Sequence, residues 1–474
     1  MMNDEFINIW KSIVYEFIIH HSSFIISKER KSKILNQLFN YINRISRVEF
    51  AVFWCCVLVQ SLAWSKFLLS VSLWALAIIS VFTFKILIKP SESGAKNRIR
   101  FDLKPTSARL YFSNFWQNKA LVALTIPFLL VLFSGFYSEN VGYWLERTRI
   151  KVPFLILPLA FANFPPLSKK QFSTIFYVFL IAFSIFCGRH LFFYYQHFED
   201  VNRGLSQGIP IPTNWNHISF GMMTVFAFLS GLELLTAQYY SGKKIQRILI
   251  GLLTVFLFVS IHILSVRSAI LALYICLIIK LLALIFYEKK WIVGLLSLAI
   301  LTTIPFIAYR TIPSLKQRIN YAIWDLDQYE RGDWEQKSDS ERIISLKMGI
   351  KSFQKHPIFG VGYGDIMDKI GEEYAQYFPK LQVREPHSFW LFSLTGTGVV
   401  GTFIFLMAFV THWFYEKRYR ILLFSLLHFL ILLTNTIDFV VEGTYGAVFY
   451  AFFVALFLCQ KVGNTEGYKK AQRL

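Results

Sequence analysis

The sequence predicts an all-α integral membrane protein, with about 12 transmembrane helices and a helical extracytoplasmic loop domain between helices 9 and 10. Hydrophobic residues make up 55% of the 474 residues and charged residues only 16%. A soluble protein of this length would need more polar surface. The apolar residues also gather into runs close to the ~20 residues that cross a bilayer.

Twelve apolar runs account for the predicted spans. In chain order they are Val48–Trp64, Phe67–Ile88, Ala120–Phe136, Val152–Asn163, Phe172–Cys187, Ile218–Thr236, Ile248–Leu264, Ser268–Phe286, Trp291–Tyr309, Ser388–Trp413, Ile421–Phe439 and Thr444–Gln460. The fourth run is short and contains proline, and the first two are separated by only two residues.

The basic residues predict which side of the membrane each connection faces. Connections assigned alternately to one side, together with both termini, carry 28 of the 49 Lys and Arg residues, whereas the short connections on the other side carry seven. By the positive-inside rule, both termini are cytoplasmic and the large loop is outside. The net charge of +20 then reflects topology and attraction to membrane lipids, and no nucleic-acid partner is expected.

These observations divide the chain into five parts. We expect a cytoplasmic amphipathic segment (1–47), transmembrane helices 1–9 (48–309), a large periplasmic loop with two helices (310–387), transmembrane helices 10–12 (388–460) and a basic cytoplasmic tail (461–474).

The outer loop contains the first candidate binding residue. Ser338 to Glu341 has the pattern of a capping box, with Ser338 as N-cap, and predicts a helix that ends at His356-Pro357. Arg342 falls in the first turn, where a cation is unfavourable by about 0.3–1 kcal/mol. It is either a solvated arginine paired with a nearby carboxylate or part of a phosphate site.

A glycine-rich turn follows this helix and precedes a second one, predicted over Asp365–Tyr377. The sequence Gly360-Val361-Gly362-Tyr363-Gly364 permits positive φ angles and close backbone approach. Gly362 and Tyr363 could belong to an anion-holding nest that lines the substrate. The alternative is a tight turn between two helices.

Two further residues stand at the outer ends of spans. His387, after Pro386, can give or take a proton near neutral pH. Arg267 lies in a three-residue connection on the face where basic residues are scarce. An anionic ligand explains this arginine better than snorkelling of its side chain does.

Three residues in other outer connections are weaker candidates. Arg147, Asn214 and His217 could line the substrate, or they could be interfacial polar residues satisfied by their neighbours. All five cysteines fall in or at the ends of spans without the spacing of a metal site.

Four motifs together resemble the O-antigen ligase family, within the larger ligase and polymerase superfamily. They are Ser265-Val266-Arg267-Ser268, Ser340-Glu341-Arg342, His356 through Gly364, and Pro386-His387-Ser388-Phe389-Trp390-Leu391. The resemblance is strongest from about Ile218 to Gly401. Ser388 stands where the family usually has asparagine.

This resemblance implies a glycosyltransferase without a metal ion or other cofactor. It would move a glycan from a polyprenyl diphosphate carrier to an acceptor hydroxyl, such as that of lipid A–core, at the outer face of the bacterial inner membrane. Arg267 and Arg342 would bind the diphosphate, and His387 would deprotonate the acceptor in an inverting displacement. Two guanidinium groups suit the charge that develops on the leaving group.

Other functions stay open from the sequence. An O-antigen polymerase or a protein O-oligosaccharyltransferase would use the same donor with another glycan or a protein as acceptor. A transporter of lipid-linked glycans is a different class. Transporters tend to place charges at mid-membrane and to contain inverted repeats, whereas the notable residues of this chain gather at the outer face.

Overall fold

The structure is a computed structural model that describes residues 47–89, 98–213, 215–236, 244–286, 288–335 and 337–460. The predicted amphipathic segment up to residue 46, the basic tail from residue 461 and the candidate Asn214 lie outside these residues. The chain forms two compact units, and the larger one contains residues 51–81 and 106–474. Every site residue discussed below belongs to the larger unit.

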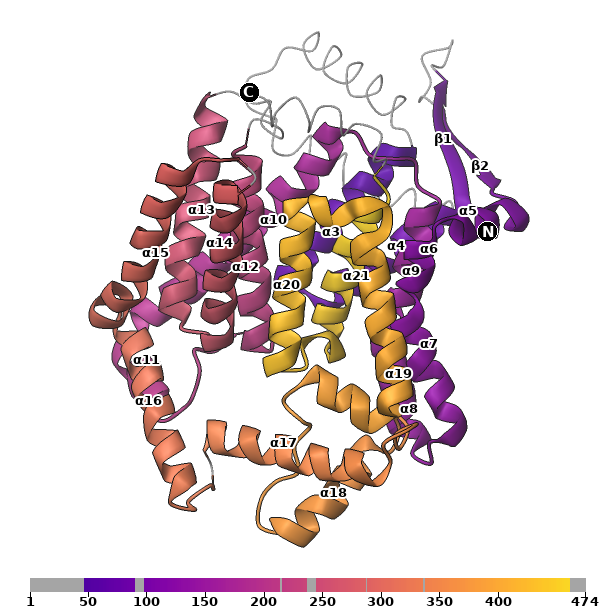
Figure 1. The fold of residues 1–474 in the computed structure, drawn as a ribbon. Helices are drawn as coiled ribbons and strands as arrows, with labels where there is room; N and C mark the ends of the chain where they lie inside the picture. The colour runs from indigo at the N-terminus through magenta and orange to yellow at the C-terminus, as the bar shows by residue number, and fades with distance from the viewer. Residues whose placement is uncertain are drawn as a thin grey trace. The chain divides into compact units, whose positions relative to one another are not determined.

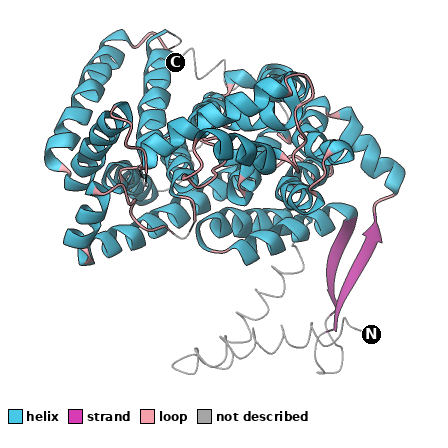
Figure 2. Cartoon of the chain, turned by 90° about the horizontal axis from the view of Figure 1, so that it is seen from below, coloured by secondary structure: helices cyan, strands magenta, loops and turns pink. Residues whose placement is uncertain are grey.

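The smaller unit includes an antiparallel hairpin of β1 (Phe82–Lys89) and β2 (Arg98–Pro105), in which Phe82 pairs with Pro105. The hairpin (Figure 2, magenta) is the one sheet among the described residues and the exception to the predicted all-α fold. The predicted span Phe67–Ile88 is therefore too long, because its helix ends at Val81. The segment from Phe82 to Lys89 is rich in aromatic and β-branched residues, which favour a strand. Lys85 in this segment would be costly in a membrane-spanning helix.

Helices form the rest of the described chain (Figure 1). In order they are α3 (Arg47–Trp64), α4 (Lys66–Val81), α5 (Ala108–Gln117), α6 (Lys119–Ala123), α7 (Ile126–Ser134), η1 (Gly135–Tyr137), α8 (Val141–Lys151), α9 (Pro153–Ala162), α10 (Lys169–Gln196), α11 (Phe198–Ser206), α12 (His217–Leu234), α13 (Lys244–Leu264), α14 (Arg267–Phe286), α15 (Trp291–Thr311), α16 (Pro313–Glu330), α17 (Ser338–Lys355), α18 (Ile366–Tyr377), α19 (Phe389–Phe414), η2 (Tyr415–Arg420), α20 (Leu422–Ile437), η3 (Val440–Glu442) and α21 (Thr444–Leu458).

Eight helical stretches of the described chain are long and apolar enough to cross a membrane. They are α3, α6 to η1, α10, α12, α13, α14, α15 and α19 to η2, and each overlaps one of the predicted spans. The spans predicted at α4, α20 and α21 are shorter apolar helices, and α9 has ten residues. The predicted membrane protein is supported, and the count of twelve spans stays a prediction.

Helix α12 lies inside the bundle and packs against α10, α13, α14 and α20. Phenylalanine rings fill the space between neighbouring helices, as where Phe226 meets Phe453 at 4.9 Å between centroids. Close packing is required because lipid tails are as apolar as side chains and leave no hydrophobic gain for helix association. Glu233 and Lys280 lie within these spans, are half-buried and pair with each other at 3.3 Å.

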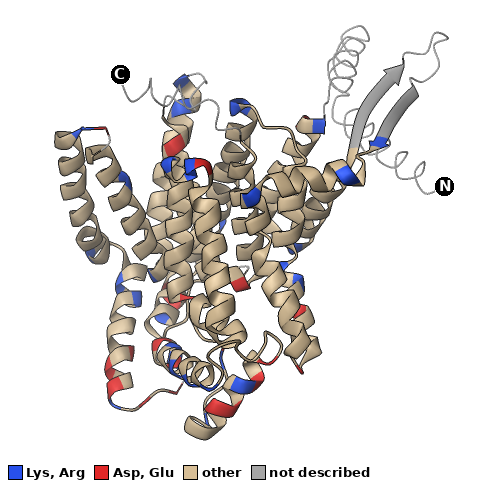
Figure 3. Cartoon of the chain, turned by 45° about the vertical axis from the view of Figure 1, so that its right-hand side comes forward, with Lys and Arg blue, Asp and Glu red and all other residues tan. Residues whose placement is uncertain are grey.

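The predicted outer loop forms three helices, not two. Helices α17 and α18 match the predicted pair, and α16 precedes them. We missed α16 because its buried face carries polar residues at helical spacing, which hides the apolar periodicity. The three helices lie together beyond one end of the spans (Figure 1). Figure 3 shows acidic and basic residues mixed at this end and few charged residues along the spans.

The glycine-rich turn braces the loop against a break in α19. Gly398 interrupts that helix with a φ of +63°. The N–H groups of Val361 and Gly362 donate to α19 carbonyls at 2.9 and 2.8 Å, and the N–H of Val399 donates to Pro357 at 2.9 Å. These bonds satisfy backbone groups that a broken helix leaves unpaired. The turn therefore has a structural role, because its N–H groups already have protein acceptors.

Replacing Gly398 by alanine is expected to lower the melting temperature of the purified protein. The backbone at Gly398, with φ +63° and ψ −168°, lies in a region essentially restricted to glycine, which costs another residue about 1–3 kcal/mol. A Cβ there would also collide with the carbonyl of Ile358. Gly251→Ala is the matched control, because a Cβ at that helical position meets nothing within 4 Å. Equal melting temperatures for the two variants would contradict the assigned role of Gly398.

Candidate functional site

The first turn of α17 is capped by a carboxylate from α16. Asp325 accepts hydrogen bonds from the N–H groups of Asp339 and Ser340 at 2.7 and 3.1 Å and from the Ser340 hydroxyl at 2.5 Å. The predicted capping box at Ser338 is wrong, because the helix begins at Ser338 itself and its N-cap, Lys337, makes no side-chain cap. The carboxylate does complement the positive end of the helix.

A polar stripe on α16 supplies this cap and a third arginine. Ser314, Arg318, Tyr321 and Asp325 recur at three- and four-residue spacing and are all at most 5% exposed. Arg318 donates to the carbonyl of Gly208 at 2.6 Å, which ties α16 to the chain after α11. Gly208 has a φ of +87°, and a side chain there would strike the Tyr321 ring. Sequence spacing on this helix could have identified Arg318.

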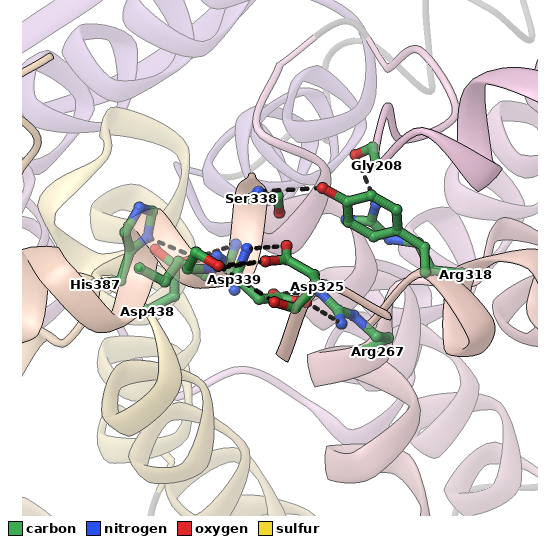
Figure 4. A network of polar contacts seen from close by, with 11 residues as sticks. Gly208, Arg267, Arg318, Asp325, Ser338, Asp339, His387 and Asp438 are labelled. Atoms are coloured by element: carbon green, nitrogen blue, oxygen red, sulfur yellow. Dashed lines mark hydrogen bonds and ion pairs between the residues drawn. The ribbon is translucent and has the colours of Figure 1, made fainter. Parts of the chain in front are cut away.

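Arg267 holds Asp339 in a bidentate ion pair, with both N–O distances 2.6 Å (Figure 4). Burial alone would raise the pKa of Asp339, but Arg267, Arg342 and Arg318 together hold it below its usual value. The pair therefore stabilises the fold at neutral pH and is lost as pH falls through the lowered pKa. Burial and the nearby charge of Arg267 lower the pKa of Arg318 to about 10.

His387 shares an acidic partner with Arg342. Its Nδ1 lies 3.8 Å from Oδ2 of Asp438, and a guanidinium nitrogen of Arg342 lies 3.6 Å from the same oxygen. Within the described chain neither His387 Nδ1 nor Asp438 Oδ2 has a hydrogen-bond partner. The backbone is fixed nearby, because Phe389 N–H donates to the Asp438 carbonyl at 3.0 Å and His387 N–H donates to Ser345 at 3.3 Å.

These groups face a cavity of about 680 Å³. His217, Arg318, Arg342, His387 and Asp438 line it, and a small pocket of about 30 Å³ continues toward Arg267 between apolar side chains. The volume is within the usual range for small-molecule sites, about 300–1,000 Å³. The structure thus brings Arg267, Arg342, His387 and His217 together although they span 171 positions, from 217 to 387.

Three predicted site residues lie elsewhere. Gly362 and Tyr363 belong to the brace on α19, and Tyr363 is buried in the core of the loop at 4% exposure. Arg147 is also buried and pairs with Glu385 and Tyr143. None of the three lines either pocket. Arg147 instead holds the chain two residues before His387.

Sequence reasoning missed three residues of the site. Arg318 was hidden in an unpredicted helix, and Asp339 was assigned to a cap. Asp438 follows the last residue of α20 and is 1% exposed. A carboxylate at the end of an apolar span is costly unless it has a cationic partner, and that cost is the signal that could have identified it.

Residues 252–406 match the model of a protein family described as O-antigen ligase. The matched region contains Arg267, Arg342 and His387, three of the residues that face the cavity and its extension. This third of the chain is therefore similar to the O-antigen ligase family. Members of this family are glycosyltransferase-like ligases and polymerases. No curated protein matches the chain.

Replacing Asp325 by alanine is expected to loosen the first turn of α17. Loss of a helix cap costs about 0.5–2 kcal/mol, and the upper part of the range applies because three hydrogen bonds are removed. Hydrogen exchange at residues 339–342 should accelerate. Asp325→Asn keeps one acceptor oxygen and should have a smaller effect, and unchanged exchange in the alanine variant would contradict the cap.

Proposed function

We propose that this protein transfers a glycan from a polyprenyl diphosphate carrier to an acceptor hydroxyl, with inversion at the anomeric carbon. One observation carries the proposal: three arginines from α14, α16 and α17 meet beside a cavity that His387 also lines. Clustered guanidinium groups suit a diphosphate, and a histidine suits proton abstraction.

The arginines would stabilise the departing diphosphate. As the sugar–phosphate bond breaks, negative charge grows on the leaving oxygen, and fixed cations in a partly dry site lower the energy of that charge. Arg267 now binds the Asp339 carboxylate, so a donor phosphate would take over the same two guanidinium nitrogens. Arg342 and Arg318 would contact the remaining oxygens. The proposed chemistry requires no metal ion.

His387 would act as the general base. Its Nδ1 faces Asp438, so Nε2 is the nitrogen that would accept the proton of the acceptor hydroxyl. The distance of 3.8 Å would shorten as substrate binds, since catalytic hydrogen bonds are often long in free enzymes. The carboxylate would then stabilise the imidazolium that forms when the acceptor oxygen attacks the sugar.

The small pocket supports a lipid-linked donor. It runs from the arginines between apolar side chains that include Leu264, Val266 and Ile218. These side chains would contact the prenyl chain where it leaves the diphosphate. Because the pocket of about 30 Å³ is too small to hold the prenyl chain, the chain itself would lie in the bilayer. We place the site at the periplasmic face of the inner membrane, with both termini cytoplasmic, because the Lys and Arg distribution predicts that orientation.

The acceptor is the open part of the proposal. Lipid A–core is our first choice. A carrier-linked glycan would make the protein a polymerase, and a protein acceptor would make it an O-oligosaccharyltransferase. The transporter hypothesis is weaker, because the described spans carry few charges (Figure 3) and two of these, Glu233 and Lys280, pair with each other.

His387→Ala is expected to abolish glycan transfer while leaving the protein folded. The assay combines purified protein in EDTA with a polyprenyl diphosphate-linked glycan and lipid A–core. General-base catalysis contributes about 10²–10⁴-fold, so the transfer rate should fall by at least about 100-fold. His356→Ala, at an exposed histidine of the same loop, is the matched control.

Each outcome separates the candidate functions. Lengthened carrier-linked glycan from the wild type would identify a polymerase, and a glycosylated protein acceptor would identify an O-oligosaccharyltransferase. Full activity of His387→Ala, or no transfer to any of the three acceptors by the wild type, would overturn the proposed mechanism.

Asp339→Asn is expected to tighten binding of the donor. The substitution removes the negative charge that competes with phosphate for Arg267, and the expected gain is roughly tenfold, about 1.4 kcal/mol. Binding of the lipid-linked donor to protein in detergent provides the measurement. Asp333→Asn, at an exposed carboxylate of the same loop, should leave the dissociation constant unchanged, and weaker binding to Asp339→Asn would contradict a phosphate at Arg267.

A further inference from the structure

Helix α8 carries three polar side chains in a row although none of them lines the cavity. Tyr143, Arg147 and Lys151 are spaced four residues apart and therefore lie on one face of the helix. Arg147 is 8% exposed and Lys151 1% exposed. Two buried cations on one helix are costly unless each has a specific partner.

The partner of Arg147 is Glu385, which lies just before His387, the proposed base. Glu385 accepts a hydrogen bond from the Tyr143 hydroxyl at 2.9 Å and forms an ion pair with Arg147 through the same carboxylate oxygen. The guanidinium group of Arg147 also lies 5.3 Å from the centroid of the Phe392 ring, in the first turns of α19. Because Glu385 is two residues from His387, these contacts fix where the histidine enters the cavity.

The partner of Lys151 is Glu442, which follows shortly after Asp438, the acidic residue that faces His387. Lys151 forms a 2.6 Å ion pair with Glu442 and donates to the carbonyl of Val441 at 3.0 Å. Both side chains of the pair are at most 1% exposed. The same ammonium group lies 5.6 Å from the centroid of the Phe389 ring. Lys151 therefore touches both the Asp438–Glu442 segment and the segment that follows His387.

We propose that α8 is a clamp that sets the separation of His387 and Asp438, with Arg147 holding the histidine side through Glu385 and Lys151 holding the aspartate side through Glu442. Arg147 and Lys151 are positioning residues and do not touch substrate. This inference rests on the proposed role of His387 as a base. It goes beyond that role by naming what holds the base in place.

The clamp explains why the Lys151–Glu442 ion pair is buried and the Arg147–Glu385 ion pair is mostly buried. An exposed pair contributes little and lets its partners move, whereas a buried pair is costly to break and so admits one arrangement. The Phe389–Asp438 backbone hydrogen bond joins the two segments directly, and α8 grips each of them from the same side. A shift of either segment changes the 3.8 Å gap between His387 and Asp438.

The test compares two arginines on one helix. Arg147→Met removes one arm of the clamp, and Arg149→Met is the matched control because Arg149 is exposed on α8. With the full-length protein in detergent and a polyprenyl diphosphate-linked glycan as donor, kcat of Arg147→Met should fall roughly 10–100-fold, as expected for a misplacement of about 1 Å. The KM for donor should stay within about twofold, because the phosphate-binding arginines are untouched.

Two conservative variants distinguish loss of the clamp from misfolding of the protein. Glu385→Gln keeps the shape and one acceptor for Tyr143 and Arg147 but removes the charge, and Arg147→Lys keeps the charge. Both should retain more activity than Arg147→Met. Equal kcat for Arg147→Met and Arg149→Met, or a raised donor KM at unchanged kcat, would overturn the clamp.

A cryo-EM structure of Lys151→Met separates the clamp from the proposed reaction. A changed His387–Asp438 distance relative to the wild type supports the clamp even where the wild type transfers no glycan, in which case the proposed function alone fails. An unchanged distance in a folded Lys151→Met protein overturns the clamp whatever the activity.

Discussion

Compensation of buried charge at the first turn of α17 is the interaction on which the site depends. Asp325 neutralises the positive end of this helix, and Asp339 in the same turn neutralises Arg267 from α14. Without these carboxylates, the helix terminus and three arginines would place unbalanced positive charge in a partly buried region. The loop therefore joins the membrane helices through paired charges as well as through apolar packing.

The same compensation makes the site suitable for an anionic substrate. A cluster of cations held by a displaceable carboxylate can exchange that carboxylate for phosphate without leaving a buried charge unpaired. Asp438 plays a different part, because its Oδ2 lies near both Arg342 and His387 and its backbone is fixed by hydrogen bonds to Thr434 and Phe389. One carboxylate can be replaced by substrate, and the other stays to support the base.

The similarity to the O-antigen ligase family, the membrane character and the grouping of Arg267, Arg342 and His387 could be predicted from the sequence. Arg267, Arg342 and His387 belong to motifs in which the residue type and its position on a span or loop are enough to indicate a site residue. Arg318 and Asp438 could not be placed in this way, because their roles depend on neighbours more than 50 positions distant. Gly362 and Tyr363 were misplaced for the opposite reason. A glycine turn has the same sequence whether its N–H groups meet a phosphate or the broken helix α19.

The sequence by itself determined the apolar spans, the large polar loop and the chemical types at the site, because these follow from local composition and periodicity. Only the tertiary structure decided which charges meet. It paired Arg267 with Asp339, capped α17 from a neighbouring helix and turned Arg147 from a candidate ligand contact into a support for the segment before His387. Pairing depends on distances of a few ångströms between distant segments, and packing sets those distances.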